Sequence, residues 1–173
     1  MVDGVTAKLV SFDPRFSEAF ASLNYEWIQH YFEVEQEDRD ALEDPVGYAI
    51  EPGGEIFFVL EERENNGEKD EEPVGTVAMV PKPDGVFELA KMAVRPDRQG
   101  KGYSNLLMNA CIEFARSRGA REVMLVTNDI LAPAMGLYTK AGFKTVEFSD
   151  NRYARGNTEM RLKLTSESCT SLR

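Results

Sequence analysis

Three runs of β-branched and aromatic residues in the middle of the chain predict neighbouring strands. They cover Glu55 to Glu61, Val74 to Val80 and Val86 to Val94, and turn residues separate them. Residues 81–85, Pro-Lys-Pro-Asp-Gly, form the second turn, because proline cannot continue a central strand and glycine permits a positive φ. The three runs are therefore expected to form an antiparallel meander.

Apolar positions take a helical period between Ser104 and Arg118, where residues 106, 107, 110, 111, 114 and 115 fall on one face. Gly119 then supplies a C-terminal stop, so this segment predicts a buried helix. A further helix is expected over Pro133 to Ala141, ended by Gly142.

Shorter patterns complete an alternation of strands and helices. Asp13 can cap a helix that has Pro14 at its first position. The remaining predicted strands are Ala7 to Phe12, Glu122 to Thr127, Phe143 to Phe148 and Glu159 to Leu164, and the remaining helical stretches are 14–23, Trp27 to Phe32 and Gln36 to Glu43, which Pro45 and Gly47 end. Together they predict an α/β protein with a mixed sheet covered by helices.

The length of 173 residues suits one domain, which we expect over residues 1–165, followed by a flexible tail over 166–173. The first residues carry no basic stretch with an apolar core, and no window approaches the roughly 18 apolar residues of a membrane span. The two cysteines, Cys111 and Cys169, suggest neither a disulfide framework nor a metal site. We therefore expect a cytoplasmic protein with no metal and no membrane partner.

Acidic residues give the chain a net charge of −10. Seven of them lie between Glu61 and Glu72, around Asn65-Asn66-Gly67, and this predicts a solvated hairpin loop. An acidic surface repels phosphate backbones, so nucleic acid is not expected as a partner and a cationic substrate is mildly favoured.

Candidate chemistry lies between the third strand and the buried helix, where residues 98–104 read Arg-Gln-Gly-Lys-Gly-Tyr-Ser. Backbone N–H groups at the start of a helix lack internal partners and carry the positive end of the helix dipole, so such a junction binds anions. A Walker loop is excluded because glycine follows Lys101 and Arg95 stands at the first glycine position. A dinucleotide fingerprint is excluded because it needs three spaced glycines and this segment has two, Gly100 and Gly102.

The remaining pattern, Gln99-x-x-Gly102-x-Ser104, resembles the Gln/Arg-x-x-Gly-x-Gly/Ala diphosphate loop of the GNAT acetyltransferases. Residues 134–143, Ala-Met-Gly-Leu-Tyr-Thr-Lys-Ala-Gly-Phe, resemble the second signature of that family, Ala-x-x-Leu-Tyr-x-x-x-Gly-Phe. The resemblance covers about Phe57 to Leu164 and departs at Ser104, where the family prefers glycine or alanine. It implies the GNAT fold, with a mixed, mostly antiparallel sheet and helices on both faces, and acetyl-CoA as the cofactor.

The resemblance also implies roles for individual residues. The pantetheine arm would lie along Met92, Ala93 and Val94, and the diphosphate would be held by Gln99, Gly100, Lys101, Gly102, Tyr103 and Ser104. A bulge in the strand would aim the amide of Met92 or Ala93 at the thioester carbonyl. Tyr138 would protonate the departing thiolate, although its periodicity alone fits a core tyrosine. Asn128 resembles an asparagine that contacts the cofactor, and it fits a strand-ending turn residue equally well.

The acceptor amine must lose a proton before it attacks, at a cost of about 4.6 kcal/mol at pH 7 for a lysine-like pKa. Glu88 resembles the acidic residue that serves some family members as a general base, directly or through water; its alternative is a solvent-facing strand position. Trp27 and Tyr31 are candidates for the acceptor pocket or for the core. Arg155, with Arg152 and Tyr153 beside it, could bind a carboxylate or phosphate of the acceptor or lie in a solvated loop.

The residues and the resemblance together predict an acetyl-CoA-dependent N-acetyltransferase. It would act on a primary amine of a small molecule or peptide by direct transfer in a ternary complex, and the resemblance is compatible with a homodimer. The alternative is a sensor or interaction module of the same fold that binds coenzyme A without turnover.

Overall fold

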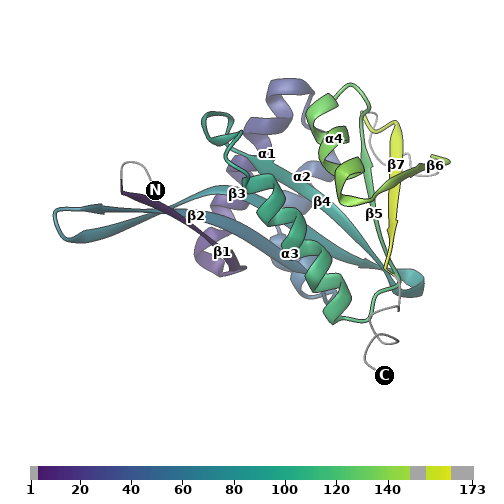
Figure 1. Ribbon diagram of the computed structural model, residues 1–173, viewed down its shortest axis with the longest axis horizontal. Coiled ribbons are helices and arrows are strands. Elements are labelled where there is room, and N and C mark those ends of the chain that lie inside the picture. The colour runs from purple at the N-terminus through teal and green to yellow at the C-terminus, as the bar shows by residue number, and fades with distance from the viewer. Residues whose placement is uncertain (1–3, 149–154, 165–173) are drawn as a thin grey trace.

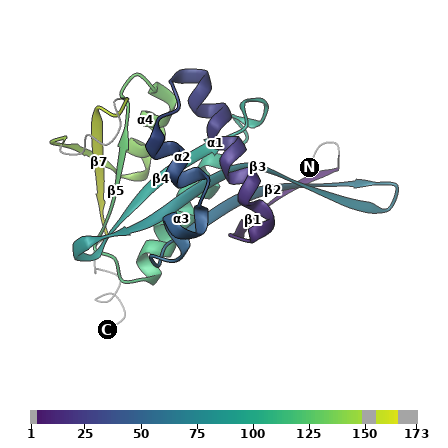
Figure 2. The same cartoon turned by 180° about the vertical axis from the view of Figure 1, so that it is seen from behind.

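The computed structural model describes residues 4–148 and 155–164. Within these residues, a seven-stranded sheet has the strand order β1-β2-β3-β4-β5-β7-β6. Helices α1 and α2 cover one face of the sheet, and α3 and α4 cover the other (Figure 1; Figure 2). No helix in the described ranges is long and apolar enough to cross a membrane. The elements are β1 (Val5–Ser11), α1 (Ser17–Tyr31), α2 (Gln36–Leu42), β2 (Glu55–Asn65), β3 (Glu68–Lys82), β4 (Val86–Val94), α3 (Tyr103–Ser117), β5 (Glu122–Thr127), α4 (Ala132–Ala141), β6 (Lys144–Val146) and β7 (Thr158–Lys163).

Strand β2 contributes to two hydrophobic cores, because successive residues of a strand point to opposite faces. Ile56, Phe58 and Leu60 belong to the core under α1 and α2. Phe57 and Val59 pack in the core under α3 and α4. Neighbouring strands pair antiparallel except β4 and β5, which run parallel. The predicted mixed, mostly antiparallel sheet with helices on both faces is therefore confirmed.

One continuous helix, α1, replaces the two helical stretches that the sequence predicted. Asn24 is buried and donates from Nδ2 to the carbonyl of Phe20 at 3.0 Å, so its side chain bonds within the helix and does not end it. Asp13 accepts from the amide of Arg15 at 3.0 Å, but the turn that it caps is a 3-10 turn over Pro14–Phe16 that leads into α1. The separate second helix was therefore wrong, and the capping role of Asp13 was right.

The predicted acidic hairpin is confirmed, but its arms are strand and not loop: β2 and β3 stay paired as far as Asn65 and Glu68. This hairpin projects beyond the body of the molecule (Figure 1). The turn itself is confined to Asn66 and Gly67, whose φ values are 51° and 82°. Lys8 of β1 lies 2.6 Å from Glu62 and 3.1 Å from Glu71. Cross-strand pairing of this kind offsets part of the repulsion among the carboxylates and allows the strands to extend.

Gly142 ends α4 with a φ of 105°, and a Cβ at this position would lie 3.2 Å from Cδ1 of Leu162. Gly142→Ala is expected to lower the free energy of unfolding by about 1–2 kcal/mol, because L-residues are strained in this region. The Tm should fall by roughly 2–8 °C in a chain of this size. Gly136, inside α4, has open space at its Cβ position, so Gly136→Ala should stabilise by about 0.5–1 kcal/mol. Thermal unfolding of both variants measures these changes. A shift of the Tm in the same direction in both variants would contradict the prediction.

Strands β4 and β5 separate soon after they start to pair. Pairing covers residues 86–88 of β4 and 122–124 of β5. Beyond these residues the two strands diverge (Figure 1). Among the residues that the structure describes, no strand therefore covers the edge of the second half of β4 that faces β5. The candidate site lies at this split.

Candidate active site

Two cavities adjoin where β4 and β5 diverge. One runs along the end of β4 and the start of α3, has a volume of about 330 Å³ and is called the cofactor groove, because most residues predicted to bind the cofactor line it. The other lies between α1, β4 and β5, has a volume of about 110 Å³ and is called the acceptor chamber, because Trp27, Glu88 and Arg155, which were predicted to serve the acceptor, line it. Both cavities are lined by Trp27, Met92, Leu131, Ala134 and Tyr138. A molecule in the groove and a molecule in the chamber would therefore meet beside these side chains.

Most residues predicted to bind the cofactor line the groove. Lys101 is exposed and is not among the lining residues. Asn128 lines the acceptor chamber instead of the groove. Arg98 also lines the groove. It was not predicted to do so, because it lies immediately before the loop motif. The predicted residues that line the groove are Met92, Ala93, Val94, Gln99, Gly100, Gly102, Tyr103 and Ser104.

The start of α3 has the donors that a diphosphate needs. Gly102 precedes the helix with a φ of 82° and provides no side-chain cap. In the part of the chain that the structure describes, no backbone carbonyl accepts from the amides of Tyr103, Ser104 or Asn105. A Cβ on Gly102 would meet nothing within 4 Å, and residues 102–105 all line the groove. The predicted diphosphate loop therefore fits an anion by its donor set and by its free space.

A buried carboxylate holds this loop against β2. Glu61 is 2% exposed and accepts from Nε of Arg98 at 2.7 Å and from the hydroxyl of Tyr103 at 2.8 Å. Burial by itself would raise the pKa of Glu61, but the hydrogen bonds from Arg98 and Tyr103 outweigh it and lower the pKa below its ordinary value. Tyr103 thus anchors the first turn of α3 by its side chain, and the residue also lines the groove. This contact was not predicted, because Glu61 stands at the end of a predicted strand and at the start of the acidic stretch that was expected to be solvated.

Strand β4 contains the bulge that the family resemblance implied. Lys91 and Met92 lie opposite the single residue Val77 of β3. Lys91 has a φ of 56°, a left-handed value that a bulge can impose on one residue. The bulge adjoins both cavities, since Met92 lines each of them. The assignment of an oxyanion donor to Met92 or Ala93 stays a prediction.

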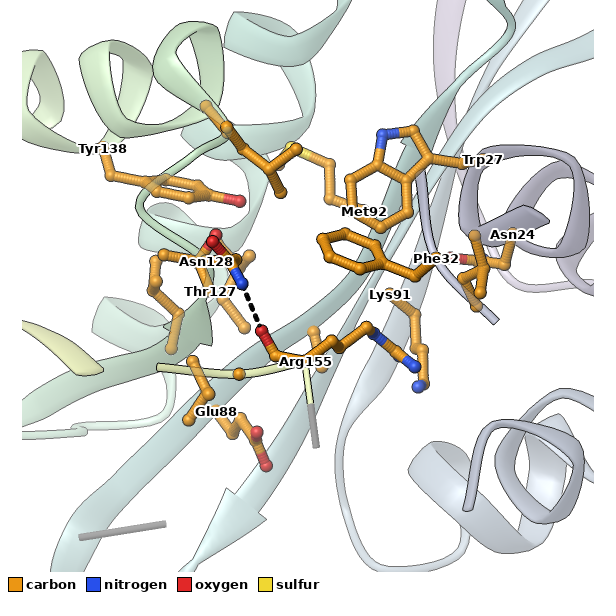
Figure 3. Close-up of a pocket in the computed structure, with 18 residues that line it drawn as sticks. Asn24, Trp27, Phe32, Glu88, Lys91, Met92, Thr127, Asn128, Tyr138 and Arg155 are labelled. Carbon is orange, nitrogen blue, oxygen red and sulfur yellow. Dashed lines mark hydrogen bonds between the residues drawn. The ribbon is translucent and has the colours of Figure 1, made fainter. Parts of the chain in front are cut away.

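Tyr138 lies on α4 at the junction of the two cavities and is 8% exposed. Its hydroxyl points into the space that Met92 and Trp27 face from the other side (Figure 3). Burial, with a smaller contribution from Cys111, raises the pKa of Tyr138 to about 12. The hydroxyl therefore stays protonated at neutral pH and has a proton to donate.

Glu88 is buried in β4, with 4% exposure, so the solvent-facing interpretation of this residue was wrong. It lines the acceptor chamber, and Nζ of Lys82 lies 3.4 Å from its Oε1. Its carboxylate lies at the far end of the chamber and points away from Tyr138 (Figure 3). The role of Glu88 as a general base stays a prediction.

The three predicted acceptor residues occupy different places. Trp27 lies at the junction of groove and chamber. Tyr31 is 46% exposed and lines only the groove. Arg155 lines the chamber, whereas Arg152 and Tyr153 lie outside the described residues.

A buried ion cluster beside the chamber was not predicted. Asp38 of α2 is fully buried and accepts from Nζ of Lys91 at 2.8 Å and from the two terminal guanidinium nitrogens of Arg155 at 2.7 and 2.5 Å. Arg155 also donates to Glu35 at 3.0 Å. Burial by itself would raise the pKa of Asp38, but the hydrogen bonds from Arg155 and Lys91 outweigh it and lower the pKa to about 2. No sequence signal marks Asp38, because its helix reads as a polar surface segment.

Asn128 joins the end of β5 to the segment before β7. Its Nδ2 donates to the carbonyl of Arg155 at 2.6 Å (Figure 3). Its Oδ1 accepts from the amide of Ile130 at 3.0 Å. The second contact is the turn that the alternative interpretation predicted. The first closes one side of the acceptor chamber.

Comparison with known proteins identifies the family. The chain matches the model of the acetyltransferase (GNAT) family over residues 19–143, more than half of its length. This chain belongs to the GNAT family of acetyltransferases. The family uses acetyl-CoA, so the cofactor predicted from the sequence is confirmed at the level of the family, whose acceptors are amines of small molecules or peptides.

Individual relatives agree with this GNAT assignment. Human N-acetyltransferase 8B is 37% identical over 96 residues, which are 53% of this chain and 39% of that protein. The chain thus matches about two fifths of that relative's length. A GNAT acetyltransferase structure from Staphylococcus aureus Mu50 has a TM-score of 0.80 at 16% identity and covers 92% of this chain and 100% of its own. A Salmonella typhimurium structure solved with its cofactor acetyl-CoA has a TM-score of 0.66 at 20% identity, with 93% and 95% covered. These structures share the GNAT fold.

Proposed function

We propose that this GNAT chain transfers an acetyl group from acetyl-CoA to a primary amine of a small molecule or peptide, directly and within a ternary complex. One observation carries the proposal: Tyr138 lines both the groove that fits the cofactor and the chamber beside it. A side chain in this position can serve a reaction between two molecules that enter from different cavities. Bound acetyl-CoA supplies the acetyl group as a thioester.

The residues of the groove bind and orient the donor. The amides at the start of α3, with Arg98, Gln99 and Gly100, hold the diphosphate by hydrogen bonds and by the positive end of the helix dipole. The uncovered edge of β4 at residues 92–94 binds the pantetheine arm. At the bulge, the amide of Met92 or Ala93 donates to the thioester oxygen as negative charge develops on it.

Two side chains move protons. Tyr138 donates its proton to the sulfur as the bond between the sulfur and the acetyl carbon breaks, and the raised pKa of this hydroxyl keeps the proton available at neutral pH. Glu88 accepts the amine proton through water, in agreement with its place at the far end of the chamber (Figure 3). Trp27 and the stem of Arg155 bound the space for the acceptor, and Tyr31 forms part of the groove near its surface.

The experiment is an assay of coenzyme A release from acetyl-CoA against a panel of amino acids, polyamines, aryl-alkyl amines and peptides, with mass spectrometry of the products. The expected result is an acetylated amine and one equivalent of coenzyme A for each amine consumed. Tight binding of acetyl-CoA without turnover on any amine would contradict the proposal and favour the binding module.

A further inference from the structure

We propose that Asp38 is a positioning residue for acetyl transfer, which fixes the β4 bulge and one side of the acceptor chamber. The inference rests on the proposed function. Asp38 lines neither cavity, so it would act through the two cations that it holds and not by contact with a substrate.

The carboxylate of Asp38 is a fully buried hub with four donors. The amide of Glu35 donates to Oδ2 at 2.9 Å and so ties the carboxylate to the start of α2. The other donors are Nζ of Lys91 and the two terminal guanidinium nitrogens of Arg155. A buried charge with this many partners is held in one place, because moving it would leave several polar groups without hydrogen bonds.

One branch of the hub reaches the cofactor strand. Lys91 is the bulge residue with the left-handed φ, and its side chain is 5% exposed. Strained backbone of this kind persists only where its surroundings determine it. The contact between Lys91 and Asp38 is such a determinant, and the next residue, Met92, lines both cavities.

The other branch reaches the opposite wall. Arg155 binds Asp38 through its guanidinium, and its own carbonyl accepts from Asn128 at the end of β5. The contacts therefore run from α2 through Asp38 and Arg155 to β5 across the chamber (Figure 3 shows Lys91, Arg155 and Asn128). These contacts, together with the split of the sheet, set the distance between β4 and β5. That distance in turn determines where an acceptor is placed.

The first test is Asp38→Asn, which keeps the shape of the side chain and removes its charge. We expect kcat per folded molecule to fall by about 10-fold to 100-fold, because a displacement of about 1 Å at a reacting centre has effects of this size. The Kd for acetyl-CoA should change by less than about threefold, since the diphosphate loop is anchored separately by Glu61. The acceptor KM should rise with the fall in kcat.

The control is Glu122→Gln, which changes another buried carboxylate that is paired with an arginine. Glu122 is 5% exposed, pairs with Arg161 and lines neither cavity. The Glu122→Gln variant should have a lower Tm and a kcat per folded molecule within about twofold of the original. If Asp38→Asn lowers the Tm and leaves kcat unchanged in the same way, the role of Asp38 is structural and the inference is overturned.

A second pair of variants tests the inference in case Asp38→Asn does not fold. Lys91→Met removes only the contact between Lys91 and Asp38 and should still lower kcat by about 10-fold. Lys91→Arg keeps a donor to Asp38 and should therefore retain most of the original kcat. Equal activity in both variants would overturn the role of the bulge branch.

Hydrogen exchange provides a readout that does not depend on turnover. In Lys91→Met, amides of residues 90–93 should exchange at least about 10-fold faster, and amides of α3 at unchanged rates. If the unmodified protein acetylates no amine, the proposed function fails, but faster exchange confined to residues 90–93 would still show that the contact between Lys91 and Asp38 fixes the β4 bulge. Unchanged exchange at residues 90–93 would overturn that role whatever the activity.

Discussion

Tyr138→Phe is expected to lower kcat by about 100-fold or more, because the loss of a general acid has effects of 10² to 10⁴. The Kd for acetyl-CoA should change by less than about threefold, since the ring remains and only the hydroxyl is lost. The ring contact with Phe143, at 6.1 Å between centroids, should also be kept. Steady-state kinetics with a responsive amine, together with calorimetric titration of acetyl-CoA, separates the two quantities.

The pH profile gives a second check on the same residue. The pKa of Tyr138 is raised to about 12, so the acid form persists on the alkaline side of neutrality, where the acceptor amine becomes deprotonated. Activity of the unmodified protein should therefore rise with pH and show no loss of the acid below about pH 11.

Tyr25→Phe is the matched control for Tyr138→Phe. The hydroxyl of Tyr25 donates to Glu43 at 3.4 Å, and the residue lines neither cavity. Its kcat should stay within about twofold of the original. Equal kcat in Tyr138→Phe and Tyr25→Phe would remove Tyr138 from the chemistry.

Ser104→Asp is expected to have the largest effect on cofactor binding. Ser104 is the second residue of α3 and lines the groove. A carboxylate in the first turn suits the helix dipole, so the fold should be kept. The same carboxylate would lie beside the diphosphate, where like charges cost several kcal/mol, and a loss of about 3 kcal/mol raises the Kd roughly 100-fold.

Ser104→Ala separates the effect of charge from the loss of the hydroxyl. It keeps the backbone amide, so the Kd for acetyl-CoA should stay within about threefold of the original. Calorimetric titration and thermal unfolding of both variants give affinity and stability independently. An unchanged Kd in Ser104→Asp would mean that the diphosphate binds elsewhere.

Local patterns predicted most of the fold. The β-branched and aromatic run along residues 55–61 and the helical period along residues 104–118 both mark elements whose apolar side chains the structure largely buries. Leu106 is the exception, because the period placed it on the buried face and it is 42% exposed. These patterns work because burial is decided residue by residue along each element. The divergence of β4 from β5 has no such signature, since it depends on how two distant strands pair. The π-helical turn over Val46–Ile50 likewise has no local signature that the sequence analysis used.

The candidate site was predicted as far as it follows from contiguous motifs. The groove loop and Tyr138 each belong to a short stretch of sequence with a recognisable spacing. The carboxylates that support the site do not, because Asp38 and Arg155 are 117 residues apart and Glu61 and Tyr103 are 42 apart. Asp38 of α2 meets Arg155 of the segment before β7, and Glu61 of β2 meets Tyr103 of α3, only in the folded chain. Polar residues of this kind therefore read as solvated surface in the sequence.

Backbone amides at the start of α3 are the groups on which the assignment depends, and titration of ¹⁵N-labelled protein with coenzyme A observes them directly. The expected result is that the amide signals of residues 100–105 shift most and saturate together, as N–H groups do when they bind a diphosphate. Binding of coenzyme A that leaves these signals in place, or an absence of binding, would contradict the assignment.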